Sequence, residues 1–367
     1  MSIITALRRL YINLQASAVV WQGEESRSFQ VQRGVRQGDP LSPLLFNLVM
    51  KEVLEEVQVV WKRRGYGTNI GSTLRGERLT HVTFADDMTL IARSLLSMKR
   101  MLLMLREALA ARGLNLHPSK CKIQTNVKEL QIRGQIELKS GFSVEALGAD
   151  SNMVLLGTLL NLTDATKHEI DNRIASGWKT FWGMKKLLLN QKVSVSRRLR
   201  LFDATVGNCV TWCCESWSPR AEELHKLEVA RRSMLRKIVD TRRGPEETWV
   251  DYILRSTHKA LDLSSRAGTR EWGRYHYERK WHWAGHVARR AADTWLYKVT
   301  TWRDSAWQHL SEEAGVHREL RPSKRRWMKW EDSLRRYTHE KGHAQWTELA
   351  QDRAVWEALV DDFINSF

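Results

Sequence analysis

The stretch VTFADDMTLI, residues 82–91, places two adjacent acidic residues between two short apolar runs. Apolar and polar residues alternate before the acids and two apolar residues close the stretch, so we expect a strand, a tight turn and a second strand. Asp86 and Asp87 would lie at the tip of this hairpin. Aspartate is common in tight turns for local hydrogen-bonding reasons. Two adjacent carboxylates also suit a divalent cation such as Mg²⁺, which prefers oxygen ligands. The residues alone leave both explanations open.

Upstream of the acidic pair, residues 33–47 have the sequence RGVRQGDPLSPLLFN. Ser42 is a residue type favoured at the N-cap of a helix, and Pro43 suits the first helical position. Apolar residues then recur at helical spacing until Gly65, whose conformational freedom commonly ends a helix. We therefore expect a helix from Ser42 to just before Gly65.

Further elements are expected downstream of the acidic pair. Apolar residues at helical spacing between Met98 and Leu109 predict an amphipathic helix that ends at Gly113. Leu155-Leu156-Gly157 is expected to be part of a short strand. From residue 163 the pattern is helical, and Thr166 with Glu169 fits a capping box.

These patterns predict an α+β fold with boundaries near residues 160 and 245. Residues 1–160 should combine an antiparallel sheet with helices, residues 161–244 should be all-helical, and residues 245–367 should form a helical, basic region rich in Trp and His. Fifteen of the seventeen tryptophans lie from Trp178 onward. Each of them is expected either to pack in a helical core or to stack on unpaired bases beside Lys and Arg.

Composition narrows the class of protein. The 367 residues carry a net charge of +17, which points to a polyanionic partner such as nucleic acid, although a solvated basic surface explains the charge equally well. No apolar run approaches the ~20 residues that a membrane span needs, so no membrane partner is expected. The four cysteines are too few and too bunched for a disulfide framework, which indicates a reducing, intracellular setting.

Two clusters contain residue types that commonly bind metal ions. Cys209, Cys213 and Cys214 with His225 do not match the usual spacing of zinc ligands, so buried thiols are the favoured interpretation. A second group, in a stretch rich in Arg and Trp, lacks cysteine partners for zinc. It could be a basic, aromatic RNA-contacting surface or ordinary helix packing, and it comprises His276, His282 and His286.

Several of these stretches resemble the motifs of reverse transcriptases. Phe84-Ala85-Asp86-Asp87 resembles motif C, the catalytic hairpin, and residues 33–47 resemble motif B of the non-LTR (LINE-type) branch. Residues 113–120 are similar to motif D and residues 155–157 to motif E, the primer grip. The likeness continues through a helical thumb and a C-terminal tail, over residues 163–218, 283–289 and 321–330.

The resemblance implies an RNA-directed DNA polymerase that works by two-metal nucleotidyl transfer. Residues 1–160 would be a partial palm, residues 161–244 the thumb, and Asp86 and Asp87 would be catalytic ligands of Mg²⁺ or Mn²⁺. Lys120 would be a catalytic cation beside the departing pyrophosphate, although it could also be an ordinary surface lysine. Contacts with template and nucleotide would come from Arg36, Gln37, Gly38 and Phe84. The implied partners are an RNA template, a DNA primer or RNA–DNA hybrid and deoxynucleoside triphosphates, in a ribonucleoprotein of the nucleus or cytoplasm.

One element of the family pattern has no match in this chain. Motif A supplies a third metal-binding aspartate upstream of motif B, but no Asp precedes Asp39, and Glu24 and Glu25 fall in an expected turn. The resemblance therefore implies an N-terminally truncated enzyme without motif A or fingers, which we expect to be inactive by itself. Two alternatives are a non-catalytic module that binds RNA or hybrid, and a chain that does not fold stably.

Overall fold

The computed structural model describes residues 2–12, 14–19, 23, 25–31, 34–70, 78–126, 134–138, 141–301, 329–343 and 345–367. Glu24, Arg33 and residues 321–328, which the sequence analysis singled out, lie outside these ranges. The chain divides into two compact units. The first consists of residues 1–68 and 78–116, and the second of residues 69–77 and 117–367.

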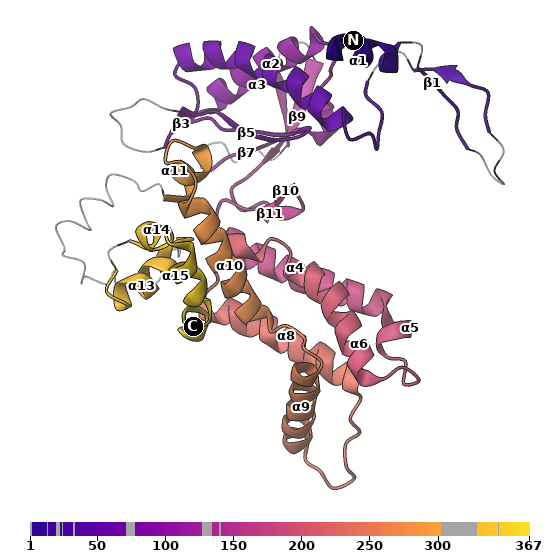
Figure 1. Ribbon diagram of the computed structural model, residues 1–367, viewed down its shortest axis with the longest axis vertical. Coiled ribbons are helices and arrows are strands. Elements are labelled where there is room, and N and C mark those ends of the chain that lie inside the picture. The colour runs from indigo at the N-terminus through magenta and orange to yellow at the C-terminus, as the bar shows by residue number, and fades with distance from the viewer. Residues whose placement is uncertain are drawn as a thin grey trace. The chain divides into compact units, whose positions relative to one another are not determined.

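The expected α+β class is confirmed, because the described chain combines small sheets, most of them antiparallel, with many helices (Figure 1). None of the described helices is long and apolar enough to cross a membrane. The boundaries expected near residues 160 and 245 stay predictions.

The first unit is built on two packed helices. Its elements in chain order are α1 (Ile3–Tyr11), β1 (Gln15–Ala16), β2 (Phe29–Gln30), α2 (Ser42–Arg63), β3 (Thr68–Asn69, at the boundary between the units), β4 (Arg78–Leu79), β5 (His81–Phe84), β6 (Asp87–Leu90) and α3 (Leu95–Ala110). Helices α2 and α3 contact each other and bury one cluster of apolar side chains, which includes Val53, Val57, Trp61, Met101 and Leu105. This burial of one helical face is what the 3.6-residue period predicted.

The ends of α2 confirm part of the sequence prediction and correct part of it. The helix stops at Arg63, and Gly65 follows with a φ of +66°. Its N-cap, however, is Leu41, and Ser42 is the first helical residue with its hydroxyl donating to the Arg36 carbonyl at 2.5 Å. Asp39 supplies a side-chain acceptor instead, because its Oδ1 accepts from the Leu41 N–H at 2.9 Å. Ser42 is therefore not the N-cap, α2 has no side-chain cap, and Asp39 instead stabilises the turn that precedes the helix.

The second unit begins with strands and continues as helices. The strands β7 (Lys122–Gln124), β9 (Phe142–Leu147) and β8 (Gly134–Leu138) form a sheet in that order, with β7 parallel and β8 antiparallel to β9. A separate hairpin joins β10 (Met153–Leu155) to β11 (Thr158–Leu160). The remaining elements are η3 (Pro118–Lys120), α4 (Ala165–Gly183), α5 (Lys185–Leu188), α6 (Val195–Phe202), η6 (Asp203–Gly207), α7 (Asn208–Val210), η7 (Cys214–Ser216), α8 (Ala221–Val239), α9 (Trp249–Arg266), α10 (Trp272–Ala288), α11 (Trp295–Thr301), α13 (Asp332–Glu340), α14 (Trp346–Leu349), α15 (Arg353–Ala358) and α16 (Val360–Asn365).

Two sequence expectations fail at the start of the second unit. Only Leu155 of the stretch 155–157 is in a strand, because Leu156 and Gly157 form the hairpin turn with φ values of +49° and +77°. The capping box at Thr166 and Glu169 is also wrong. Asp164 caps α4 by accepting from the Lys167 N–H at 3.2 Å.

Tryptophan fills much of the second unit's interior. Trp281 of α10 and Trp356 of α15 stack with ring centroids 3.6 Å apart and an interplanar angle of 4°. Each indole N–H donates to the other residue's carbonyl oxygen, at 2.9 and 3.1 Å. Trp217, Trp272 and Trp346 are buried as well. The core interpretation thus holds for these tryptophans, because all of them are buried. The indole N–H groups of the stacked pair and of Trp346 find acceptors, whereas those of Trp217 and Trp272 have none among the described residues.

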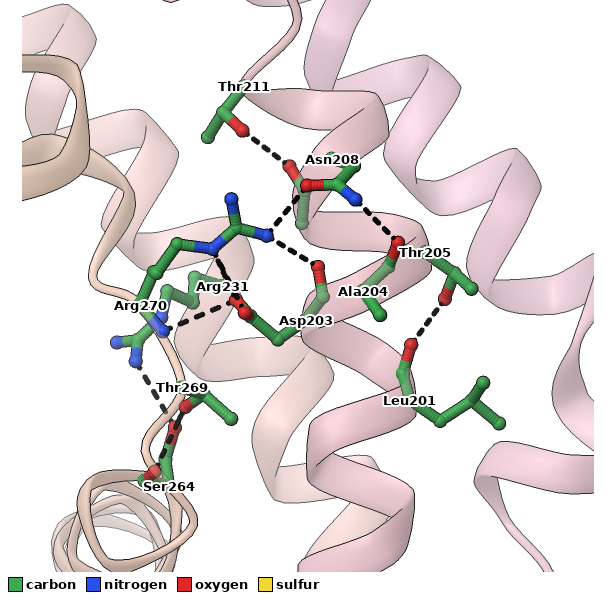
Figure 2. A network of polar contacts seen from close by, with 11 residues as sticks. Leu201, Asp203, Ala204, Thr205, Asn208, Thr211, Arg231, Ser264, Thr269 and Arg270 are labelled. Carbon is green, nitrogen blue, oxygen red and sulfur yellow. Dashed lines mark hydrogen bonds and ion pairs between the residues drawn. The ribbon is translucent and has the colours of Figure 1, made fainter. Parts of the chain in front are cut away.

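A polar network fixes the π-helical turn η6 to the segment that joins α9 and α10 (Figure 2). Arg270 donates from Nε to Asp203 Oδ2 at 2.9 Å and from Nη2 to the Asp203 carbonyl at 2.8 Å. The same Nη2 reaches Asn208 Oδ1 at 2.8 Å. One guanidinium therefore bonds both ends of a rare helical turn and holds it against a segment more than 60 residues away.

Candidate active site

The acidic pair occupies the predicted hairpin in the first unit. Strands β5 and β6 are antiparallel, and Phe84 pairs with Asp87 across a two-residue turn formed by Ala85 and Asp86. Ala85 has a φ of +52°, in the left-handed region that favours glycine. Asp86 and Asp87 are both exposed, as is the ring of Phe84 with 67% of its surface accessible. The tip thus presents two carboxylates and an aromatic side chain to solvent.

The bend before α2 is the second predicted part of the site. Gly38 has a φ of +89°, and no atom lies within 4 Å of the position that a Cβ would take there. The glycine is therefore required by backbone conformation and leaves the bend open on its outer side. Gln37 and Arg36 are also exposed. Arg36 already donates from Nη2 to the Leu10 carbonyl at 3.1 Å, so its guanidinium anchors the bend to the end of α1.

The hairpin and the bend share one supporting core. Met88 and Leu90 of β6 pack against the apolar cluster between α2 and α3, and so does Phe46 near the start of α2. The two predicted parts are thus attached to the same rigid scaffold within the first unit. Neither aspartate is buried against another partner, which leaves both carboxylates available to a ligand.

The donors present suit a hard divalent cation only in part. Carboxylate oxygens are the ligands that Mg²⁺ prefers, and Mg²⁺ often takes one or two carboxylates together with substrate phosphates. Across the described residues, no group of three His, Cys, Asp or Glu side chains lies close enough to hold a metal ion. Two adjacent, exposed carboxylates offer oxygen ligands of the kind that Mg²⁺ prefers, and the role of Asp86 and Asp87 as metal ligands stays a prediction.

Lys120 belongs to the second unit. It ends the 3₁₀ turn η3 of the second unit, and its side chain is exposed. The role of Lys120 beside a leaving pyrophosphate stays a prediction.

The hairpin that resembles the primer grip is held by two residues of α4 that the sequence analysis did not identify as a pair. Glu169 accepts the Leu159 N–H at 2.7 Å, and Arg173 donates to the Gly157 carbonyl. Arg173 Nε also donates to Glu169 Oε1 at 2.5 Å, and both side chains are buried. The four-residue spacing of Glu and Arg is the signal that could have indicated this pair.

The cysteine and histidine clusters are only partly buried: Cys214 and His276 lie in the helical packing, whereas His225, His282 and His286 are exposed. Cys214 is buried, and desolvation raises the pKa of its thiol to about 12. His276 is also buried, with Nδ1 at 2.7 Å from the Cys214 carbonyl. Burial, reinforced by the nearby Lys280 charge, lowers the pKa of His276 to about 3. The buried-thiol interpretation is thus confirmed for Cys214, while Cys209 and Cys213 are partly exposed.

Comparison with known proteins agrees with the geometry of the first unit. The sequence model of the reverse transcriptase (RNA-dependent DNA polymerase) family matches residues 2–148. An uncharacterized transposon-derived protein of Caenorhabditis elegans is 26% identical over 295 residues, which cover 78% of this chain and 97% of that protein.

Two retrotransposon polyproteins match a shorter region with higher identity. The Pol polyprotein from the R2 element of Nasonia vitripennis is 33% identical over 132 residues, or 33% of this chain and 12% of the polyprotein. That of the R2DM element of Drosophila melanogaster is 37% identical over 101 residues, or 28% of this chain and 8% of the polyprotein. The chain thus matches only a small share of these longer relatives. Residues 2–148 are a reverse transcriptase domain, and the chain is homologous to the Pol polyproteins of R2-type non-LTR retrotransposons.

Proposed function

We propose that this chain binds an RNA template paired with a DNA primer, and that Asp86 and Asp87 hold a divalent cation at the primer end. The observation that carries the proposal is the exposed acidic hairpin on the same core as the Gly38 bend. Reverse transcriptases use divalent metal ions and bind nucleic acid templates and nucleotides. When bound, Mg²⁺ supplies Lewis-acid stabilisation to the attacking 3′ oxygen and the leaving pyrophosphate.

The protein side chains have distinct parts in this proposal. Gln37 offers amide donors and acceptors to the nascent base pair, and Gly38 lets the backbone approach it closely. Phe84 presents an apolar surface beside the carboxylates. Arg36 holds the bend in place through Leu10 and is thereby a positioning residue as well as a source of positive charge. Lys120 supplies a cation for the pyrophosphate.

A polypeptide of these 367 residues alone should bind but not polymerise efficiently. Two carboxylates can retain one cation, whereas bridging two cations about 3.5–4 Å apart needs a further ligand. No Asp precedes Asp39 in the sequence, and Asp39 itself accepts a backbone N–H in the turn before α2. We therefore propose that these residues bind nucleic acid and a cation, and that DNA synthesis needs a third carboxylate.

Metal titration and primer extension together test the proposal. Mn²⁺ should bind the full chain weakly in a calorimetric titration, and Asp86→Asn or Asp87→Asn should abolish that binding. The matched control is Glu55→Gln on α2, an exposed carboxylate in the same unit, which should leave the titration unchanged. Binding that survives both aspartate changes would contradict the cation site.

Primer extension on an RNA template tests whether the chain synthesises DNA. We expect little synthesis with Mg²⁺ or Mn²⁺, while a labelled RNA–DNA hybrid binds and its affinity falls steeply with salt. Robust synthesis that disappears in Asp86→Asn would show instead that two carboxylates suffice. Hybrid binding that survives Asp86→Asn without any synthesis favours a second function, that of a nucleic-acid-binding module, which the net charge of +17 also supports.

A further inference from the structure

Helix α10 has one buried face and one exposed face, and the exposed face carries an ordered row of side chains. Trp281 on the buried face is fully inaccessible, whereas Trp283, two residues later, has 38% of its surface exposed. His286 follows Trp283 by three residues and so lies on the same side of the helix, whereas Arg290 lies two residues beyond the end of α10 and reaches His286 from there. Both His286 and Arg290 are exposed. A large aromatic ring is thus kept at the surface directly beside a core rich in Trp.

The three side chains are already arranged against one another. The Trp283 and His286 rings stack with centroids 5.3 Å apart and an interplanar angle of 22°. Arg290 donates from Nε and Nη2 to His286 Nε2, at 3.3 and 3.1 Å. Nε2 is therefore an acceptor, and the proton of the neutral ring lies on Nδ1. Fixing these side chains before a ligand arrives lowers the entropy lost on binding.

Of the two arginines that flank this surface, one is paired with a carboxylate and the other is not. One turn before Trp283, Arg279 pairs with Glu215 at 3.3 Å. At the other end, Arg290 has no carboxylate partner among the residues that the structure describes. A ligand that used both the ring and Arg290 would need a flat aromatic surface next to an anionic group.

We propose that Trp283, His286 and Arg290 form a stacking site for one unpaired base of single-stranded nucleic acid, with Arg290 on the adjacent phosphate. The identification of the ligand as nucleic acid rests on the proposed function. A single strand fits better than a duplex, because a duplex hides the faces of its bases. An acidic peptide could neutralise Arg290 but has no general use for the ring face of Trp283.

Fluorescence anisotropy with the full chain tests this site. The probes are a labelled 12-nucleotide oligouridylate and a labelled RNA duplex of the same length. Trp283→Ala should weaken binding of the single strand by about 5- to 100-fold, because stacking contributes that much per base. Trp283→Phe should retain most of the affinity, and Arg290→Gln should weaken binding and flatten its salt dependence. Duplex affinity should not change with Trp283→Ala.

Two control variants separate the effect of losing the stacking ring from the effects of losing any exposed tryptophan or any surface charge. Trp249 on α9 is more exposed, at 63%, but contacts Tyr252 rather than a cation, so Trp249→Ala should have little effect. Arg266 is exposed and paired with Asp262 at 3.0 Å, so Arg266→Gln should matter less than Arg290→Gln. Circular dichroism melts confirm that each variant is folded.

The outcomes distinguish this proposal from the function on which it rests. An equal loss for Trp283→Ala and Trp249→Ala, or an equal loss for single strand and duplex, would overturn the stacking site while leaving nucleic acid binding intact. If the unmodified chain bound neither probe nor the RNA–DNA hybrid, the proposed function itself would fail.

Discussion

Arg173 and Glu169, one turn apart on α4, form a buried ion pair whose two members bond the outer edge of the β10–β11 hairpin. The Leu159 N–H and the Gly157 carbonyl would otherwise be open groups on a two-stranded sheet. The ion pair takes the place of a third strand, because it satisfies one donor and one acceptor of β11 and its turn. The hairpin and helix α4 are thereby joined into one element.

Breaking this pair should be costly. Glu169→Gln leaves the Arg173 charge buried without its partner, and such losses typically cost about 3–5 kcal/mol of unfolding free energy. Asp171→Asn is a matched control on the same helix, because Asp171 pairs with Lys226 at the surface, where about 0–1 kcal/mol is expected. Urea unfolding followed by intrinsic fluorescence measures the difference in the second unit, which holds fifteen of the seventeen tryptophans. Similar costs for the two changes would contradict the structural role of the pair.

The network around η6 should depend on the shape of the guanidinium and not only on its charge. Arg270→Lys keeps the charge but cannot bond the Asp203 carboxylate, the Asp203 carbonyl and Asn208 together, so we expect a loss of about 1.5–3 kcal/mol (Figure 2). Arg266→Lys, in an exposed pair, is expected to cost less than about 0.5 kcal/mol. Equal midpoints of urea unfolding for the two variants would show that the network contributes nothing specific.

Acid should destabilise the second unit through His276. Burial, followed by the nearby Lys280 charge, lowers the pKa of His276 to about 3, against about 6.5 in an unfolded chain. Between these values the unfolded state binds more protons, so the unfolding free energy falls as pH drops, by up to about 1.4 kcal/mol per pH unit. Burial also lowers the pKa of Lys280, to about 7. Lys280 therefore affects the pH dependence of the unfolding free energy only above about pH 7.

Variants assign the acid effect to one group. His276→Gln removes the titrating ring and should flatten the stability profile between pH 6.5 and pH 3, whatever its effect on stability at pH 7. His258→Gln alters an exposed histidine of α9 and should leave the profile as it is. An unchanged acid slope in His276→Gln would assign the pH dependence to other residues.

Local sequence patterns predicted the elements whose determinants are local. The β5–β6 hairpin, the end of α2 before Gly65 and the helix ending before Gly113 all follow from periodicity and from glycines at turns. Amphipathic α1 (Ile3–Tyr11) was missed, although Ser2 is a favoured N-cap residue type and accepts the Thr5 N–H in the structure.

Predictions failed where a distant partner decides the local structure. Thr166 has the right residue type for a capping box, but its hydroxyl accepts the Ser218 N–H, 52 residues away, at 3.2 Å. Glu169 likewise serves the β11 backbone and Arg173 instead of its own helix end. In the candidate site, sequence alone identified the acidic pair and the Gly38 bend, whereas the tie from Arg36 to Leu10 depends on how α1 lies in the unit.

The turn at Leu156 should be stabilised by a change that weakens its function. Leu156 adopts a φ of +49° and leaves 46% of its surface exposed, and Gly157 follows at +77°. Two consecutive positive φ values are typical of a type I′ turn, for which Asn-Gly is strongly preferred. Leu156→Asn should therefore raise the unfolding free energy by up to about 1 kcal/mol, since a left-handed leucine is strained by about 1–2 kcal/mol.

An exposed, strained leucine is expected where a ligand uses it. Leu156→Asn should lower affinity for the RNA–DNA hybrid although the protein becomes more stable. Val154→Thr, at an exposed strand position of the same hairpin, controls for a general loss of apolar surface. A variant that gained stability and kept full hybrid affinity would indicate that Leu156 has no role in binding.

Apolar surface on the first unit should cause self-association of the chain. In the described part of the chain β5 and β6 form a sheet of two strands, and Val82 and Phe84 on one face of β5 are 55% and 67% exposed. Leu44 and Leu48, one turn apart on α2, are exposed by more than half as well. A two-stranded sheet with exposed apolar side chains favours pairing with a second chain.

Sedimentation velocity should show that the mass rises with concentration. The double change Val82→Thr with Phe84→Ser should reduce this rise, whereas Val229→Thr on α8 should not. A monomer at every concentration would show that this exposed apolar surface does not drive self-association.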